Sequence, residues 1–162
     1  MINKCTLALA KTFIMPYISV WLHIIWATKN RYPFLRKEIR PLVWDHIKTN
    51  ARSKNIFIDC VNGHDEHAHC MVSLCCDQTI SKTVQLIKGE SSFWINKEKL
   101  IKEKFEWPDE YYAVSVSQSQ IDKVRVYILN QEEHHQKITF QQEYDEFIRR
   151  YGFEKVMEKG KT

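Results

Sequence analysis

The stretch NGHDEHAHCMVSL, residues 62–74, places three histidines and two carboxylates within six residues and then becomes apolar. On a β-strand, alternate side chains share one face. The first face therefore carries Asp65, His67, His69, Met71 and Ser73, and the second carries Ala68, Cys70, Val72 and Leu74. We expect the second face to be core and the first to display an imidazole pair.

The strand pattern of this stretch has a partner immediately before it. Residues 56–63, IFIDCVNG, are rich in β-forming side chains and end in Asn62-Gly63, a dipeptide favoured in tight turns. The two segments are predicted to form an antiparallel hairpin that turns at Asn62-Gly63.

The rest of the chain alternates strand and helix patterns around this hairpin. A strand is predicted at 17–28 and helices at 37–53 and 79–101, followed by a strand at 111–119 and helices at 119–135 and 139–153. This order predicts an α+β fold of the ferredoxin-like or RRM-like split βαβ type. We expect an antiparallel sheet of about four to five strands with helices on one face.

Composition limits the class of protein. A chain of 162 residues with 44% hydrophobic and 27% charged residues fits one globular domain, which we place at 15–153. Residues 1–14 are a candidate disordered extension before a start at Met15, and 154–162 form a polar tail. The net charge of +4 tolerates a nucleic-acid partner without demanding one.

The cysteines and the lengths of the apolar runs indicate the cellular compartment of the protein. The five cysteines show no CxxC pair or framework spacing, so we interpret them as reduced thiols of a cytoplasmic protein. No apolar run approaches the ~20 residues that span a bilayer, so we expect no membrane segment.

The imidazole pair has two interpretations. His67 and His69 on one side of a strand can chelate a divalent metal if a third ligand arrives from elsewhere, and a zinc hydrolase using His64 as well is one such arrangement. Alternatively, the two are ordinary surface or core histidines.

A second constellation lies in the helix predicted at 119–135. Tyr127 and Gln131 are four residues apart and so share one helix face. The simpler interpretation is a core tyrosine among aliphatic neighbours, followed by a solvated helix end at 132–135.

Several short motifs of the sequence match those of a known family. They are His67-Ala68-His69, YILNQ at 127–131 followed by His134-His135, WATKNRYPF at 26–34, ISKTVQLIKGESSFWI at 80–95, YAVSVSQS at 112–119 and EYDEFIRRYG at 143–152. Over residues 17–153 the chain resembles the single-tyrosine HUH transposases, especially the branch associated with repetitive extragenic palindromes. It departs from the pattern in its small Ala68 and in Pro108-Asp109 after Trp107.

The resemblance implies a function and its site residues. It implies a metal-dependent single-stranded DNA strand transferase in which Tyr127 is the nucleophile and forms a 5′-phosphotyrosine intermediate. His67, His69 and Gln131 would hold Mg²⁺ or Mn²⁺. The alternative within the family is a domesticated relative that binds hairpin DNA without cutting it.

The implied partners are single-stranded DNA carrying a hairpin and a second copy of the chain. Candidate DNA-binding residues are Lys29, Arg31, Arg36, Lys82 and Lys88, with Tyr32 and Phe34 as stacking surfaces. Charges scattered in this way also fit an ordinary solvated surface. The resemblance implies a homodimer, and we place its contact at the edge of the strand at 17–28.

Overall fold

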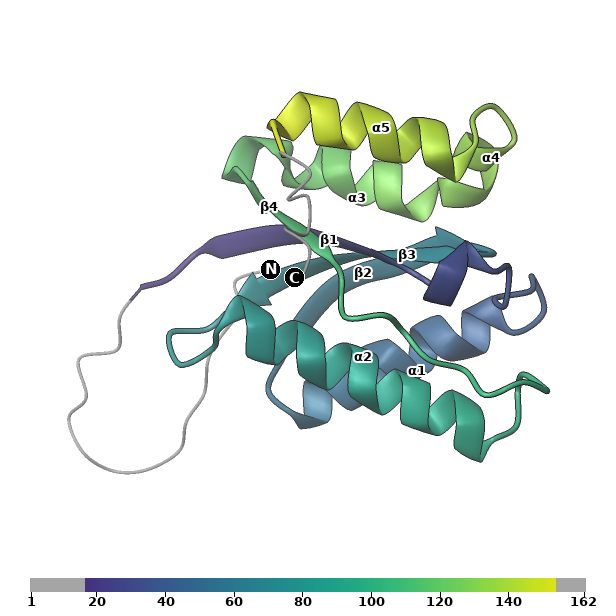
Figure 1. The fold of residues 1–162 in the computed structure, drawn as a ribbon. Coiled ribbons are helices and arrows are strands. Elements are labelled where there is room, and N and C mark those ends of the chain that lie inside the picture. The colour runs from purple at the N-terminus through teal and green to yellow at the C-terminus, as the bar shows by residue number, and fades with distance from the viewer. Residues whose placement is uncertain (1–16, 154–162) are drawn as a thin grey trace, which may run out of the picture.

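The computed structural model describes residues 17–153. Its four strands form one antiparallel sheet in which the spatial order differs from the order along the chain. The strands are β1 (Val20–Ala27), β2 (Phe57–His64), β3 (His67–Leu74) and β4 (Tyr112–Val116), in the order β2-β3-β1-β4 (Figure 1). The predicted α+β fold with an antiparallel sheet is confirmed. The predictions for residues 1–14 and 154–162 lie outside the described residues.

Helices cover both faces of the sheet. The helices α1 (Arg40–Ser53) and α2 (Ile80–Lys97) lie on one face, as predicted (Figure 1). The later helices α3 (Ile121–Leu129), α4 (Gln131–His135) and α5 (Phe140–Tyr151) lie on the other. The expectation of helices on one face thus describes only α1 and α2, because the second face also carries a buried apolar side chain, Met71, that must be covered.

The main core follows the predicted alternation of side chains. Ile24 and Trp26 of β1 and Cys70 and Val72 of β3 are fully or almost fully buried and belong to the cluster that includes residues of α1 and α2. Ala68, between the two histidines, is fully buried on this face as well. The first and second faces of β3 are therefore assigned as the sequence predicted.

The hairpin turns three residues later than predicted. Asn62 and Gly63 lie inside β2, and the turn is formed by Asp65 and Glu66, with Gly63 opposite Ala68. A Cβ atom on Gly63 would lie 2.1 Å from the carbonyl oxygen of His67. The glycine is needed for close approach of two strands, a use that the sequence pattern does not distinguish from a turn.

The predicted helix at 119–135 is divided in two. It begins with the short 3-10 helix η2 (Gln118–Gln120), and Asn130, at φ −96° and ψ 22°, then separates α3 from α4. Asparagine competes with helical hydrogen bonding through its own side chain, so it suits such a break. Tyr127 and Gln131 consequently belong to different helices.

The predicted dimer contact on the first strand is wrong. β1 pairs with β3 along one side and with β4 along the other, so it is an interior strand. The edges of the sheet are β2 and β4.

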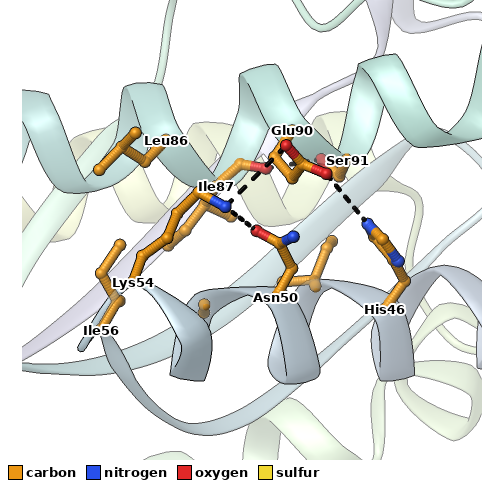
Figure 2. Close-up of a pocket in the computed structure, with 10 residues that line it drawn as sticks. His46, Asn50, Lys54, Ile56, Leu86, Ile87, Glu90 and Ser91 are labelled. Atoms are coloured by element: carbon orange, nitrogen blue, oxygen red, sulfur yellow. Dashed lines mark hydrogen bonds and ion pairs between the residues drawn. The ribbon is translucent and has the colours of Figure 1, made fainter.

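A polar seam joins α1 to α2 on the side away from the imidazole pair (Figure 2). Glu90 lies 3.8 Å from His46 Nε2 and 3.9 Å from Lys54 Nζ, and His46 stacks on Trp94 at 4.1 Å. Burial lowers the pKa of His46 more than Glu90 raises it. These contacts tie the helices together and give the seam a structural role.

Two further expectations are tested by residues 17–153. No helix in this part of the chain is both long and apolar enough to cross a membrane. Cys60, Cys70 and Cys76 are free thiols, as predicted.

Candidate metal and nucleophile site

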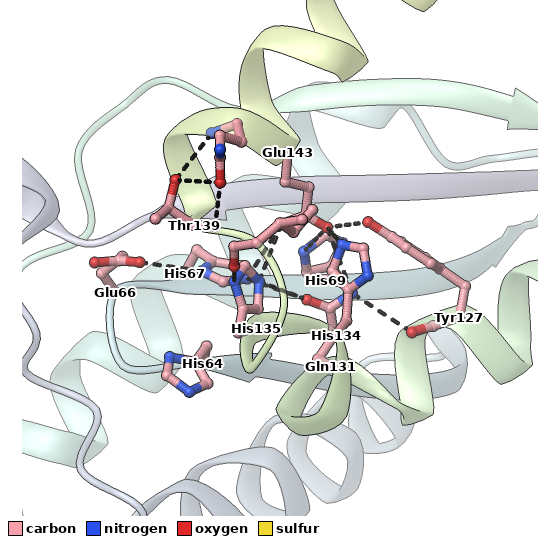
Figure 3. Close-up of polar contacts among 12 residues, drawn as sticks. His64, Glu66, His67, His69, Tyr127, Gln131, His134, His135, Thr139 and Glu143 are labelled. Atoms are coloured by element: carbon pink, nitrogen blue, oxygen red, sulfur yellow. Dashed lines mark hydrogen bonds and ion pairs between the residues drawn. The ribbon is translucent and has the colours of Figure 1, made fainter.

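The two histidines of β3 are fully buried under the helices of the second face (Figure 3). His69 Nδ1 lies 3.0 Å from Nε2 of His23, a buried residue of β1. This hydrogen bond fixes the ring and leaves His69 Nε2 facing the helices without a hydrogen-bond partner. An imidazole oriented in this way is typical of a metal ligand held by a second residue behind it.

The short helix α4 contributes two groups to His67. Gln131 and His135 are four residues apart and share a face, as helical spacing requires. Gln131 Oε1 lies 3.3 Å from His67 Nε2, and His135 Nε2 lies 3.1 Å from both of these atoms. The structure thus brings together the predicted His67 and Gln131, and adds His135.

The helix α5 places a carboxylate among the imidazoles. Glu143 is 6% exposed, and its Oε2 lies 3.1 Å from His135 Nε2 and 3.8 Å from His67 Nε2. Its Oε1 lies 3.5 Å from His69 Nε2 and accepts a hydrogen bond from the Tyr127 hydroxyl. Glu143 therefore connects the predicted nucleophile to both histidines of β3.

Burial controls the protonation of these groups. It lowers the pKa of His69 to about 3 and that of His135 to about 4, with neighbouring histidines adding to both shifts. Burial also lowers the pKa of His67 well below its usual value, and burial followed by Glu146 raises that of Glu143 to about 8. Neutral imidazoles keep a lone pair free, which is the form that binds metals.

The basic segment after β1 holds α5 over the site. This segment includes the 3-10 helix η1 (Lys29–Arg31), and the Arg31 guanidinium lies 5.3 Å from the Phe140 ring centroid and 4.6 Å from that of Tyr144. A capping box between Thr139 and Gln142 begins α5. Cation–π contact and capping together fix the helix that carries Glu143.

A buried arginine links the hairpin turn to α4. Arg40 is 5% exposed, and its guanidinium lies 3.6 Å from Asp65 and 3.2 Å from Glu132. The turn is also tied to the segment after β1, since the Thr28 and Leu35 amides donate to the carbonyls of Glu66 and Asp65. These contacts align the strand bearing His67 with the helix bearing Gln131.

The predicted DNA-binding residues are dispersed. Lys29 pairs with Glu106 at 2.9 Å, Arg36 is exposed, and the exposed Lys82 donates to Gln85 at 3.1 Å. Lys88, in contrast, is buried, and its ammonium donates to the backbone carbonyls of residues 108–110. These bonds give Lys88 a structural task in holding the segment before β4.

Lys88→Met is therefore expected to lower the free energy of unfolding by about 2 kcal/mol, because three carbonyls lose a charged donor. Chemical denaturation measures this loss, and the exposed Lys82→Met is the control, expected to change stability by less than about 0.5 kcal/mol. Equal stability of the two variants would contradict the structural role.

Three functional candidates were missed from the sequence: His23, His135 and Glu143. Two had a signal. His135 lies one turn after Gln131, and Glu143 lies on the same helical stripe as Phe140 and Phe147, where a carboxylate is out of place. Within the described chain, His67, His135 and Glu143 form the group of potential metal ligands, and neither the predicted His69 nor His64 of the zinc alternative is in it.

A cavity of about 440 Å³ opens beside Tyr127. Its lining includes the cations Lys123 and Arg150, the acidic side chains of Glu143 and Glu146, and the aromatic ring of Phe147. The cavity therefore offers both charged groups and a stacking surface next to the Tyr127 side chain.

Comparison with known proteins shows the family of the chain. The family model described as "Transposase IS200 like" matches residues 17–131. A candidate transposase from Deinococcus radiodurans R1 is similar in structure at a TM-score of 0.58 and 20% identity, over 77% of this chain and 98% of that one.

A REP-associated tyrosine transposase bound to a REP hairpin is similar at a TM-score of 0.54 and 16% identity, over 82% of this chain and 76% of that one. No curated protein matches. The two structures show that the fold is shared. The family model covers most of the sequence, and the chain belongs to the IS200-like transposase family.

Proposed function

We propose that this transposase is a metal-dependent strand transferase that cleaves and rejoins single-stranded DNA through a 5′-phosphotyrosine at Tyr127. The observation that carries the proposal is the convergence of the Tyr127 hydroxyl with the buried His67, His69 and Gln131 through Glu143. A phenol, two imidazoles and an amide gathered from three elements are more than a packed core requires.

The residues fit a divalent metal. His69 Nε2 is buried without a hydrogen bond, and His67 Nε2 and Gln131 Oε1 lie 3.3 Å apart, as two ligands of one ion can. His67, His69 and Gln131 would hold Mg²⁺ or Mn²⁺. When bound, the ion would polarise the scissile phosphate and stabilise the charge that develops on its oxygens.

Tyr127 performs the covalent step. Its phenolic oxygen attacks the phosphorus, the bond from phosphorus to the 3′ oxygen breaks, and a 3′-hydroxyl is released as the 5′ end becomes attached to the enzyme. The hydrogen bond to Glu143 orients the phenol toward the histidines. Because the new bond is again a phosphodiester, attack by another 3′-hydroxyl rejoins DNA without ATP.

The surroundings of Tyr127 suit single-stranded DNA. In the adjoining cavity, Lys123 and Arg150 would contact phosphate, and Phe147 and Tyr151 would stack on a base. Lys29, Arg31, Arg36 and Lys82 remain further candidates for DNA contact, although Lys82 and the buried Lys88 lie on α2, across the sheet from this cavity. The named REP-hairpin complex supports a hairpin in the substrate.

The cellular setting is also part of the proposal. We place the protein in the cytoplasm as a homodimer, with a sheet edge at β2 or β4 as the contact in place of β1. An unpaired strand edge offers the backbone hydrogen bonds that a second copy would need.

The proposal predicts a covalent complex that requires metal. Purified protein is incubated with labelled single-stranded oligonucleotides covering the flanks of its gene, with Mg²⁺, with Mn²⁺ or with EDTA, and resolved on a denaturing gel. A protein–DNA adduct is expected with metal and none with EDTA, because the phosphate charge is then unopposed.

Two outcomes would favour the alternatives. DNA that binds without an adduct at any metal concentration would support a domesticated binder. Hydrolysis without an adduct, dependent on Zn²⁺ and lost in His64→Ala, would support the zinc hydrolase.

A further inference from the structure

Two side chains of the site have no place in the ligand set of His67, His69 and Gln131. His135 lies at the end of α4 with its side chain buried, and Glu143 enters from α5 (Figure 3). Both point at His67 Nε2, from 3.1 Å and 3.8 Å respectively, and they lie 3.1 Å from each other. Gln131 Oε1 is 3.1 Å from His135 Nε2 and faces the same space.

We propose that His135 and Glu143 are additional ligands of the metal centre, and that they make it prefer Mn²⁺ or Zn²⁺ over Mg²⁺. The inference rests on the proposed function, since it enlarges the same metal site. It concerns the identity of the ligands and of the ion, and not the covalent chemistry of Tyr127.

The spacing of the four atoms supports coordination. Ligand atoms about 2.0–2.2 Å from one ion lie about 3–3.6 Å from each other in tetrahedral or octahedral arrangements. Five of the distances among His67 Nε2, Gln131 Oε1, His135 Nε2 and Glu143 Oε2 are 3.3, 3.1, 3.1, 3.8 and 3.1 Å. A single ion therefore fits among them with adjustments of a few tenths of an ångström.

Hydrogen bonding alone leaves this cluster unsatisfied. Glu143 Oε2 and His69 Nε2 are buried without a hydrogen-bond partner, and so is His134 Nε2, 3.6 Å from Glu143 Oε1. The carboxylate form of Glu143 is unfavourable among neutral imidazoles unless a compensating charge lies beside it. A divalent cation supplies that charge and uses the free lone pairs.

The donor set argues for the choice of ion. With His135 and Glu143 included, imidazole nitrogens outnumber the carboxylate, and one amide oxygen is present. Mg²⁺ prefers oxygen ligands and keeps several waters, whereas imidazole binds Mn²⁺ and, more strongly, Zn²⁺. We expect Mn²⁺ to bind at least about tenfold more tightly than Mg²⁺.

The test measures metal binding without DNA. Mn²⁺ binding to the full chain is followed by electron paramagnetic resonance of the free ion and by calorimetry, and Mg²⁺ by competition. Glu143→Gln and His135→Asn are each expected to weaken Mn²⁺ binding about 10–100-fold, the range for lost groups around a metal.

Matched controls keep the charge and ring changes but sit away from the ion. Asp145→Asn removes an exposed carboxylate two residues along the same helix, and His46→Asn removes an imidazole in the seam between α1 and α2. Both are expected to bind Mn²⁺ within about twofold of the wild type. Circular dichroism and melting without metal verify folding, and Glu143→Asp replaces Glu143→Gln if the latter does not fold.

The outcomes separate this inference from the proposed function. Wild-type Mn²⁺ affinity in both Glu143→Gln and His135→Asn, together with lost binding in His67→Asn, would overturn the inference and leave the metal-dependent transferase intact. Equal affinity for Mg²⁺ and Mn²⁺ would overturn the ion preference. Wild-type affinity in His67→Asn as well would instead count against the proposed function.

Discussion

Tyr127→Phe is expected to eliminate the covalent protein–DNA adduct and to reduce strand cleavage at least about a thousandfold. The substitution removes one oxygen atom, the proposed nucleophile, and leaves the ring in place against His69 and His134. Without that oxygen no phosphotyrosine can form, and water is not held in its position. End-labelled oligonucleotides resolved on denaturing gels measure both the adduct and the cleaved strand.

Tyr112→Phe is the matched control. Its hydroxyl contacts Tyr144 and not the histidines, so the variant should form adduct as the wild type does. An adduct that persists in Tyr127→Phe would show that another residue attacks the phosphate.

Gly63→Ala is expected to lower the free energy of unfolding by about 3 kcal/mol and to weaken metal binding. The new methyl group would lie 2.1 Å from the His67 carbonyl oxygen and 2.9 Å from the Ala68 Cα, which are both backbone atoms. The strands must separate to accept it, and His67 moves with its backbone. Urea denaturation and Mn²⁺ titration measure the two effects.

Gly89→Ala, the same substitution at another site, is expected to change the free energy of unfolding in the opposite direction. Gly89 lies within α2, and a Cβ atom there meets nothing within 4 Å. Alanine should therefore stabilise the protein by about 0.5–1 kcal/mol through its helix propensity. If Gly63→Ala were as stable as Gly89→Ala, the close approach of β2 and β3 would be contradicted.

Local periodicity was enough to predict most of the fold. Alternation in residues 67–74 assigned His67 and His69 to one face and Ala68, Cys70 and Val72 to the other, because β-strand geometry follows directly from residue spacing. The turn at Asp65-Glu66 was missed because Gly63 serves strand pairing, and a glycine looks the same in either role.

The site was predictable only in part, for a similar reason. His67 lies in one short motif, and Tyr127 and Gln131 lie in another, and both motifs suggest the chemistry of their residues. The structure brings the three residues together. The contact between Glu143 and the β3 histidines joins residues more than seventy positions apart, and no local pattern specifies such a contact. The interior position of β1 likewise depends on long-range pairing.

The break at Asn130 places the proposed nucleophile and the proposed metal ligands on two separate helices. Tyr127 belongs to α3, whereas Gln131 and His135 belong to α4, and one residue joins the two helices. A DNA strand attached to Tyr127 would therefore be held by α3, whereas α4 would hold the ion on the His67 side of the site. In an unbroken helix, the attachment point of the DNA and the ion-holding side chains would belong to one rigid element. The break thus separates the residue that would carry the DNA end from two of the residues that would hold the ion.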